Sequence, residues 1–201
     1  MGRPAAYRFD FSGGALCLDF ANTFGDRPRN REEHLGDWRD LVAWAEQAGV
    51  ISRQEAARAG RSALDAERAF AAAVRIRNQM YGVFSALAAG RAPARRDLSA
   101  INAALGEALA HARVEPRGDG FAWGWTGDDS PLDRVRWAVV RSAGDLLVSP
   151  EQSDVRECAS GTCSWLFLDR SPTHRRRWCS MKTCGNRDKV RRFHARRHAQ
   201  P

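Results

Sequence analysis

The stretch CASGTCSWLFLDRSPTHRRRWCSMKTCGNR, residues 158–187, holds four of the chain's five cysteines in the pattern C-x4-C-x15-C-x4-C. The two close pairs, Cys158 with Cys163 and Cys179 with Cys184, have the arrangement of a zinc site. A tight turn can deliver two thiolates to one ion, and a second segment folded against the first completes the tetrahedral shell. The spacing therefore predicts one structural Zn²⁺ bound by these four residues.

Other roles for these thiols fit the sequence less well. Buried thiols or a redox pair are the alternative interpretation. Disulfides are uncommon in the reducing, intracellular compartment that we expect for a chain whose start does not resemble a signal peptide. The side chains of His174, His194 and His198 could replace a cysteine, but four thiolates already close the shell, which leaves no open position for catalysis. Cys17, outside the pattern, is expected to be a small buried apolar residue within a strand.

The residues around the two cysteine pairs predict a small fold. Residues 165–168 are apolar and β-prone, which indicates a short strand. The segment after Cys184 has the pattern of a helix, and Val190 with Phe193 forms a narrow apolar stripe that we expect to pack on the hairpin. A ligand turn, a hairpin and a second ligand pair entering a helix are the outline of a treble-clef zinc finger.

The positive charge of the chain is concentrated in this region. The formal net charge is +8; residues 151–201 hold 12 Lys and Arg against 5 Asp and Glu, whereas residues 1–150 hold 20 against 19. Some of these cations can compensate the negative zinc–thiolate cluster, but the surplus predicts that a polyanion binds here. The residues predicted to contact nucleic acid are Arg175, Arg176, Arg177, Lys182, Arg187, Lys189, Arg191, Arg192, Arg196 and Arg197.

The sequence of residues 1–150 is typical of an α+β domain with two strand pairs and four to five helices. Residues 7–20 alternate with period two on both sides of Gly13-Gly14, which predicts two strands in a hairpin. Turn residues 118–120 separate two further extended pieces. Helices are predicted from apolar spacing at about residues 35–45, 53–59 (with a capping box of Ser52 and Glu55), 62–89, 97–111 and from Pro131 onward. The polar stretch 149–154 predicts a boundary between an N-terminal domain at 1–150 and the finger at 151–201.

Residues 184–187 read Cys-Gly-Asn-Arg, and the segment from about 156 to 192 resembles the CGNR zinc-finger family, which is named after that tetrapeptide. The 165–167 strand, the 169–171 turn and the RRWCSM run at 176–181 share in the resemblance. LCLDFANTF at 16–24 is similar to the opening of the ABATE domain that precedes such fingers. The resemblance implies a treble-clef finger with zinc on Cys158, Cys163, Cys179 and Cys184, in a bacterial group of stress-responsive transcription regulators.

From these observations we expect a cytoplasmic DNA-binding transcription regulator, whose finger contacts duplex DNA and whose N-terminal domain senses a ligand or partner. A non-catalytic protein-interaction module and an RNA-binding protein are the alternatives, since each could use the same basic finger. Asp19, Asn22 and Arg27 form a possible ligand pocket. Residues 1–150 contain no Gly-rich phosphate loop and no recognisable nucleophile–base set, so we expect no enzyme. No apolar run approaches transmembrane length, so no membrane partner is expected.

Overall fold

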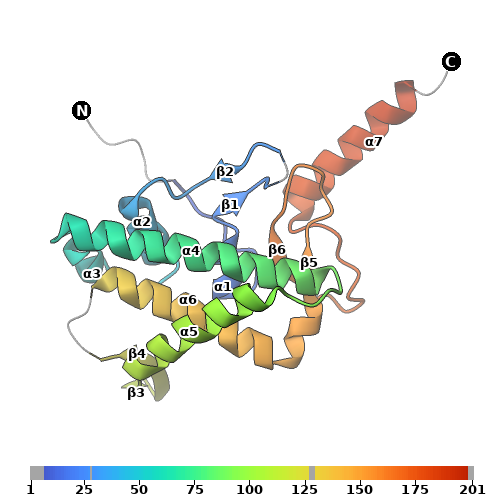
Figure 1. Cartoon of the computed structure of the whole chain (residues 1–201). Helices are drawn as coiled ribbons and strands as arrows, with labels where there is room; N and C mark the ends of the chain where they lie inside the picture. Colours follow the sequence, from blue (N-terminus) through green and yellow to red (C-terminus); the bar gives the residue numbers. More distant parts are fainter. Residues whose placement is uncertain (1–6, 28, 127–129, 199–201) are drawn as a thin grey trace, which may run out of the picture.

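The computed structural model describes residues 7–27, 29–126 and 130–198, without the side chains of residues 192 and 195–198. Three long helices form the body, the short helix α1 packs between two of them, and the C-terminal finger lies at one end (Figure 1). The helices are α1 (Leu16–Ala21), α2 (Trp38–Gln47), α3 (Arg53–Arg58), α4 (Ala63–Ala88), α5 (Arg95–His111), α6 (Pro131–Val148) and α7 (Asn186–His198), with a 3-10 turn η1 (Pro150–Asp154) and a π-helical turn η2 (Met181–Gly185). The strands are β1 (Phe24–Gly25), β2 (Glu32–Glu33), β3 (Ala112–Arg117), β4 (Gly120–Trp125), β5 (Val155–Glu157) and β6 (Leu166–Leu168), which pair as β1–β2, β3–β4 and β5–β6, all antiparallel.

The helices predicted between residues 35 and 148 are confirmed as α2 to α6. The Ser52 hydroxyl accepts the N–H of Glu55 at 3.2 Å, and the Glu55 carboxylate accepts the N–H of Ser52 at 2.7 Å, which is the expected capping box at the start of α3. Gly49 and Gly90 follow α2 and α4 with φ of +70° and +66°, a conformation that stops a helix and favours glycine. Within the described chain, none of the helices has both the length and the apolar content that a bilayer crossing requires.

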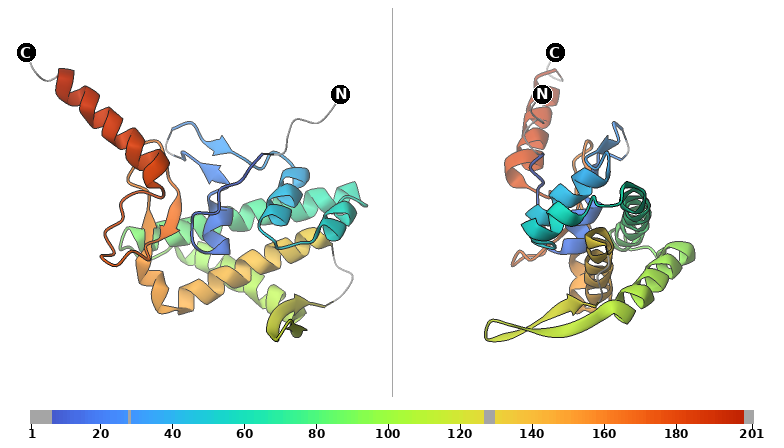
Figure 2. Two further views of the ribbon diagram at one scale, coloured as in Figure 1. Left: turned by 180° about the vertical axis from the view of Figure 1, so that it is seen from behind. Right: turned by 90° about the vertical axis from the view of Figure 1, so that its left-hand side faces the viewer.

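The predicted second hairpin is also confirmed. Strands β3 and β4 pair along their whole length, from Ala112 with Trp125 to Arg117 with Gly120. The turn between them contains Gly118 at a φ of +59°. The hairpin stands out from the helical body (Figure 2), so its strands contribute little to the core.

The predicted hairpin at residues 7–20 is wrong. Residues 7–15 form no strand, and residues Leu16–Ala21 form α1. The alternation of Leu16, Leu18 and Phe20 indicated one buried face, but every residue from 17 to 21 is buried, because α1 packs against both α4 and α6. A short helix that is covered on most sides needs no amphipathic stripe. The period-two spacing of its apolar residues therefore did not indicate a strand.

The first strand pair lies further along the chain, at β1–β2, and has only two residues in each strand. Arg77 of α4, which is 1% exposed, anchors it. Both terminal nitrogens of this guanidinium donate to the Glu33 carboxylate at 2.7 Å, and one also donates to the Thr23 hydroxyl at 3.2 Å. The ion pair of buried Arg77 with Glu33 ties β2 to α4.

The β5–β6 hairpin is built into the main core. Val155, Leu166 and Leu168 are buried in the same apolar cluster as α1, α2, α4 and α6. The side chain of Asn22 donates to the carbonyl of Leu166 at 2.9 Å and accepts its N–H at 2.8 Å, the two bonds that a neighbouring strand would make. The carbonyl of Gly13 accepts the N–H of Leu168 at 2.8 Å. The hairpin that carries the first cysteine pair is therefore held by the N-terminal part of the chain.

Candidate metal centre and nucleic-acid interface

Two separate segments bring the four predicted ligands together. Cys158 and Cys163 lie in the turn between β5 and β6, where the N–H of Cys158 donates to the carbonyl of Trp165 at 2.9 Å. Cys179 and Cys184 lie before and within η2, directly ahead of α7. A ligand turn in a hairpin and a second ligand pair at the start of a helix form the treble-clef arrangement that was predicted, and this confirms the expected fold of the finger.

The sulfur positions fit a tetrahedral zinc ion. The four ligand atoms all lie within 4.8 Å of one another. The Sγ–Sγ distance is 3.8 Å between Cys163 and Cys179, and 3.7 Å between Cys179 and Cys184. Zn–S bonds of about 2.3 Å in a tetrahedron place neighbouring sulfurs about 3.8 Å apart. The cluster is a four-cysteine site for one structural Zn²⁺, as the sequence predicted.

The protonation of the thiols also favours a cation. Hydrogen bonds from the thiols of Cys163 and Cys179 lower the pKa of Cys158. The same interactions raise the pKa values of Cys163 and Cys179, because a second thiolate beside the first is repelled by it. A divalent cation among the sulfurs stabilises all four thiolates, which is the chemistry that this donor set supports.

A small apolar cluster and one arginine surround the site. Phe167 is fully buried against the cysteines, with Trp165 and Trp178 partly buried beside it. The guanidinium of Arg176 lies 4.5 Å from the Phe167 ring centroid and donates to the carbonyls of Trp178 and Cys179. Arg176 was predicted to contact nucleic acid, but its guanidinium is already bound within the finger.

Glu157 links the first ligand to the helical body. It directly precedes Cys158, and its carboxylate accepts hydrogen bonds from the hydroxyls of Tyr81 at 3.0 Å and Ser85 at 2.7 Å, both on α4. Burial, followed by the nearby Glu157 charge, raises the pKa of Tyr81 to about 12, so the phenol stays a donor. No local sequence pattern predicts this contact, because its partners lie more than 70 residues apart.

Arg187 supports the metal site from the first turn of α7. Its guanidinium donates to Sγ of Cys184 at 3.6 Å and to the hydroxyl of Thr162 at 3.2 Å. A cation hydrogen-bonded to a ligand sulfur stabilises the thiolate and orients it. Arg187, predicted as a nucleic-acid contact, therefore has a second role next to the zinc.

Arg187→Gln is expected to lower the zinc affinity of the protein by about 10- to 100-fold, as the loss of partners behind metal ligands commonly does. The matched control is Lys189→Gln, which removes the same charge from an exposed position two residues along α7. Competition with a chromophoric chelator measures both. Equal zinc affinity in the two variants would contradict a role for Arg187 at the metal.

The other predicted nucleic-acid residues lie mostly on the surface. The side chains of Arg175, Arg177, Lys182, Lys189 and Arg191 are exposed. The side chains of Arg192, Arg196 and Arg197 lie outside the described part of the chain, although their backbone belongs to α7. The helix projects away from the body in both views, and its first turn starts at the cysteine cluster (Figures 1 and 2). The metal site thus sets the direction of the helix that carries the basic residues after Cys184.

The expected packing of Val190 and Phe193 on the hairpin is wrong. Their side chains are 57% and 52% exposed. The helix is held at its first turn by η2 and the cysteine cluster, so its later turns need no apolar stripe against the hairpin. This leaves two apolar side chains on a cationic helix that faces solvent.

The three residues of the predicted ligand pocket have internal contacts. Asp19 accepts the N–H of Gly13 at 2.7 Å, and Asn22 pairs with β6 as described above. Both line a space of about 10 Å³, which Arg27 does not line and which is about the size of one water molecule. The guanidinium of Arg27 lies over the rings of Tyr81 and Phe24, at 3.7 and 4.5 Å from their centroids. Burial lowers the pKa of Arg27 to about 10.

Burial raises the pKa of Asp19 to about 7, and the hydrogen bond from Gly13 offsets this only in part. The folded protein therefore binds this proton more tightly than the unfolded chain, in which the carboxyl titrates near 3.9. The free energy of unfolding should decrease as the pH rises from about 4 to about 7. Asp19→Asn, which can still accept the Gly13 N–H, should remove up to about 4 kcal/mol of this dependence. Urea unfolding from about pH 4 to about pH 8 measures it, and an unchanged slope would contradict the assignment.

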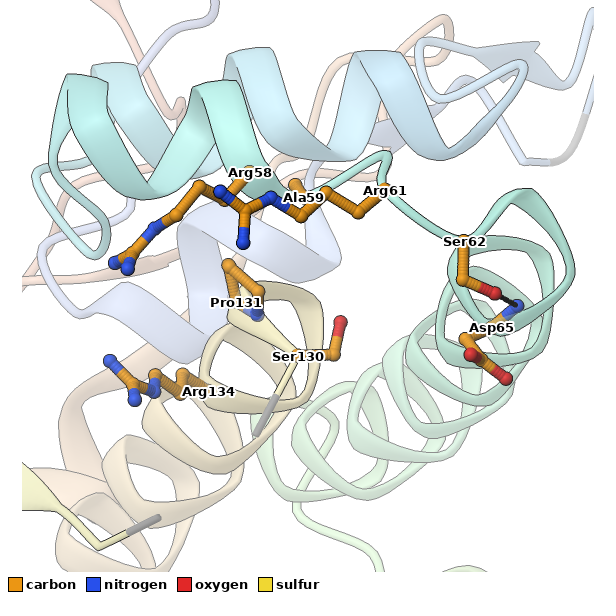
Figure 3. Close-up of a pocket in the computed structure, with 8 residues that line it drawn as sticks. All are labelled: Arg58, Ala59, Arg61, Ser62, Asp65, Ser130, Pro131 and Arg134. Carbon is orange, nitrogen blue, oxygen red and sulfur yellow. Dashed lines mark hydrogen bonds between the residues drawn. The ribbon is translucent and has the colours of Figure 1, made fainter. Parts of the chain in front are cut away.

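A larger cavity, of about 560 Å³, lies at the opposite end of the body from α7 (Figures 1 and 3). It is bordered by the end of α3 and by the N-terminal ends of α4 and α6. Arg134 of α6 lines it and also donates to Glu55 at 2.8 Å. The lining residues are Arg58, Ala59, Arg61, Ser62, Asp65, Ser130, Pro131 and Arg134. None of them was predicted from the sequence, because three separate helices meet here and no local motif marks them.

Comparison with known families agrees with this geometry. The model of the ABATE family, described as "Putative stress-induced transcription regulator", matches residues 14–150, and the model of the CGNR zinc finger matches residues 155–197. These are the two families that the sequence resembles, and they are a regulator family and a zinc-finger family rather than families of enzymes. No curated protein matches the chain.

Proposed function

We propose that this chain, which belongs to the ABATE family and carries a CGNR zinc finger, is a transcription regulator that binds duplex DNA through the finger. The observation that carries the proposal is α7, a cationic helix that starts at the zinc ligands and projects into solvent (Figure 1). Because Cys184 lies directly before this helix, the metal would fix the orientation of the DNA-binding surface.

The dimensions and side chains of α7 support a duplex as the partner. Its 13 residues span about 20 Å, and a helix fits the major groove of DNA. Lys189 and Arg191 are exposed on it, and arginine can bind both phosphate and the edge of guanine. The exposed side chain of Phe193 suits contact with a thymine methyl group.

RNA and an acidic protein are the two alternative partners of the same surface. The full chain, loaded with zinc, should be titrated with duplex DNA, a structured RNA and an acidic polypeptide at matched ionic strength. The proposal expects the duplex to bind most tightly and to displace the other two. Tighter binding of either competitor would assign the finger to that partner instead.

We also propose that the N-terminal part senses a small anionic ligand at the cavity of Figure 3. Its volume of about 560 Å³ is in the usual range for ligand pockets. Arg58 and Arg61 outweigh the lining acid Asp65, while Arg134 is paired with Glu55, so the lining carries an excess of positive charge. A thermal-shift screen of the full chain against phosphorylated and carboxylated metabolites tests this, since a bound ligand raises the melting temperature. Arg58→Gln should abolish any shift that arises at this cavity.

Three further expectations from the sequence also belong to this proposal. We propose a division of the chain at about residue 150, a cytoplasmic location and a non-catalytic role. The family matches at 14–150 and 155–197 support the first and the last of these. The core that residues 155–168 share with the helical body implies that the two parts act as one unit.

A further inference from the structure

The loop between β1 and β2 reaches the cysteine turn of the finger. A β-carbon placed on Gly161, between Cys158 and Cys163, would lie 3.5 Å from Nη2 of Arg29 and 3.5 Å from Nη1 of Arg191. These two guanidinium nitrogens are therefore at most about 7 Å apart. Arg29 belongs to the N-terminal part and Arg191 to α7, so two distant segments direct cationic groups to one point.

The position of each group is fixed by contacts elsewhere. Arg29 lies on the segment between β1 and β2, and β2 is tied to α4 by the ion pair of buried Arg77 with Glu33. Gly161 lies between two zinc ligands. The Nη2 group of Arg191 donates to the carboxylate of Asp188, which is 3% exposed, while Nη1 is the nitrogen nearest Gly161. The loop and the base of α7 lie on the same side of the molecule (Figures 1 and 2).

One of the two guanidinium groups at this point has no acidic partner within the described chain. Arg29 and Arg31 are exposed, and within the described chain their side chains make no hydrogen bond or ion pair. Asp188 pairs with Arg191, whereas Asp26 and Glu32 lie near the cysteine turn without an ion pair to Arg29. A guanidinium group without an acidic partner, beside a second guanidinium nitrogen that faces the same point, can bind an anion by charge-assisted hydrogen bonds.

We propose that Arg29, Gly161 and Arg191 form a phosphate-binding point for the DNA backbone, so that the N-terminal part touches the duplex that the finger binds. This proposal rests on the proposed function. Charge-assisted hydrogen bonds of about 2.8 Å let one phosphate bridge two guanidinium groups at this separation. Gly161 has no side chain to occupy the space between them. A backbone contact positions the protein without reading sequence, so it would set the orientation of the helical body on the duplex.

The test uses the full, zinc-loaded chain and a short mixed-sequence duplex, with fluorescence anisotropy at several salt concentrations. Loss of one phosphate contact makes the slope of log K against log salt shallower by about 0.9, which corresponds to about 8-fold weaker binding at 0.1 M salt. Arg29→Gln should show both changes, and Arg29→Lys should recover most of the affinity. The matched control is Arg53→Gln, an equal loss of charge on exposed α3 at the far end of the body (Figure 1).

Three results are possible, and they separate the two proposals. If Arg29→Gln loses affinity and slope while Arg53→Gln does not, the phosphate-binding point is supported. If Arg29→Gln binds as the unchanged protein does, or if both variants lose affinity and slope equally, this inference is overturned and DNA binding by the finger still stands. If the unchanged protein shows no salt-dependent binding to the duplex, the proposed function fails and this inference fails with it.

Discussion

Cys179→Ser is expected to abolish zinc binding and to unfold the finger. Cys179 is 2% exposed, and its sulfur lies 3.8 and 3.7 Å from those of Cys163 and Cys184. Three remaining sulfurs leave the ion an incomplete shell, and in small zinc units the binding energy, on the order of 10 kcal/mol, is also folding energy. The measured zinc content should fall from one ion per chain to none. The backbone amides of residues 158–191 should lose their protection against hydrogen exchange.

The effect should extend into the helical body. Val155, Leu166 and Leu168 belong to the main core, so loss of the finger loosens the hairpin that carries them. We expect the helical signal of α1 to α6 to persist at room temperature but to melt several degrees lower. Cys17→Ser is the control, because Cys17 is fully buried next to α6 and away from the cluster. The Cys17→Ser protein should retain one zinc per chain. A Cys179→Ser protein that retains one zinc would contradict the assignment of the ligands.

Glu33→Ala is expected to destabilise the protein by about 1–3 kcal/mol, because it leaves the buried Arg77 guanidinium without its carboxylate partner, while the 37% exposure of the Glu33 side chain lets water compensate in part. Arg77 is 1% exposed, and both of its 2.7 Å bonds to carboxylate oxygens go to Glu33. Without that carboxylate, a guanidinium charge stays buried in α4 next to the aromatic ring of Phe24. Urea unfolding at neutral pH measures the change.

Glu32→Ala provides the matched control. Glu32 is the neighbouring residue of β2 and is exposed like Glu33, but the carboxylate bonds of Arg77 go to Glu33, so the loss of Glu32 should change the free energy of unfolding by no more than about 0.5 kcal/mol. Equal effects of the two substitutions would show that Arg77 does not depend on Glu33. Because the pair ties β2 to α4, and Arg29 lies on the segment that leads into β2, Glu33→Ala should also weaken any DNA contact made by that segment.

The sequence predicted those parts of the structure in which short-range chemistry decides the outcome. The C-x4-C-x15-C-x4-C spacing predicted the metal site, since two tight turns can supply four sulfurs wherever their segments meet. The capping box at Ser52 and the glycines after α2 and α4 marked helix ends correctly, because such signals act within one helical turn.

The prediction failed where distant contacts override local pattern. Residues 16–21 alternate like a strand, yet they form a helix because α4 and α6 cover them. The contact of Asn22 with Leu166 spans 144 residues, and no motif announces it. Val190 looked like a packing residue, but α7 is held by the zinc site at its first turn and needs no second support. The role of Arg187 at Cys184 was missed for a similar reason, since a run of arginines does not reveal which of them turns inward.

The central claim is that a zinc ion shapes the finger into a cationic surface for duplex DNA. The most direct measurement is the affinity of the full chain for a duplex over a range of salt concentrations, before and after zinc is removed with a chelator. With zinc bound and six to eight phosphates neutralised, the slope of log K against log salt should be about −5 to −7. Removal of zinc should weaken binding strongly and make the slope shallower. The same affinity and slope without zinc, or a slope near zero with it, would contradict the claim.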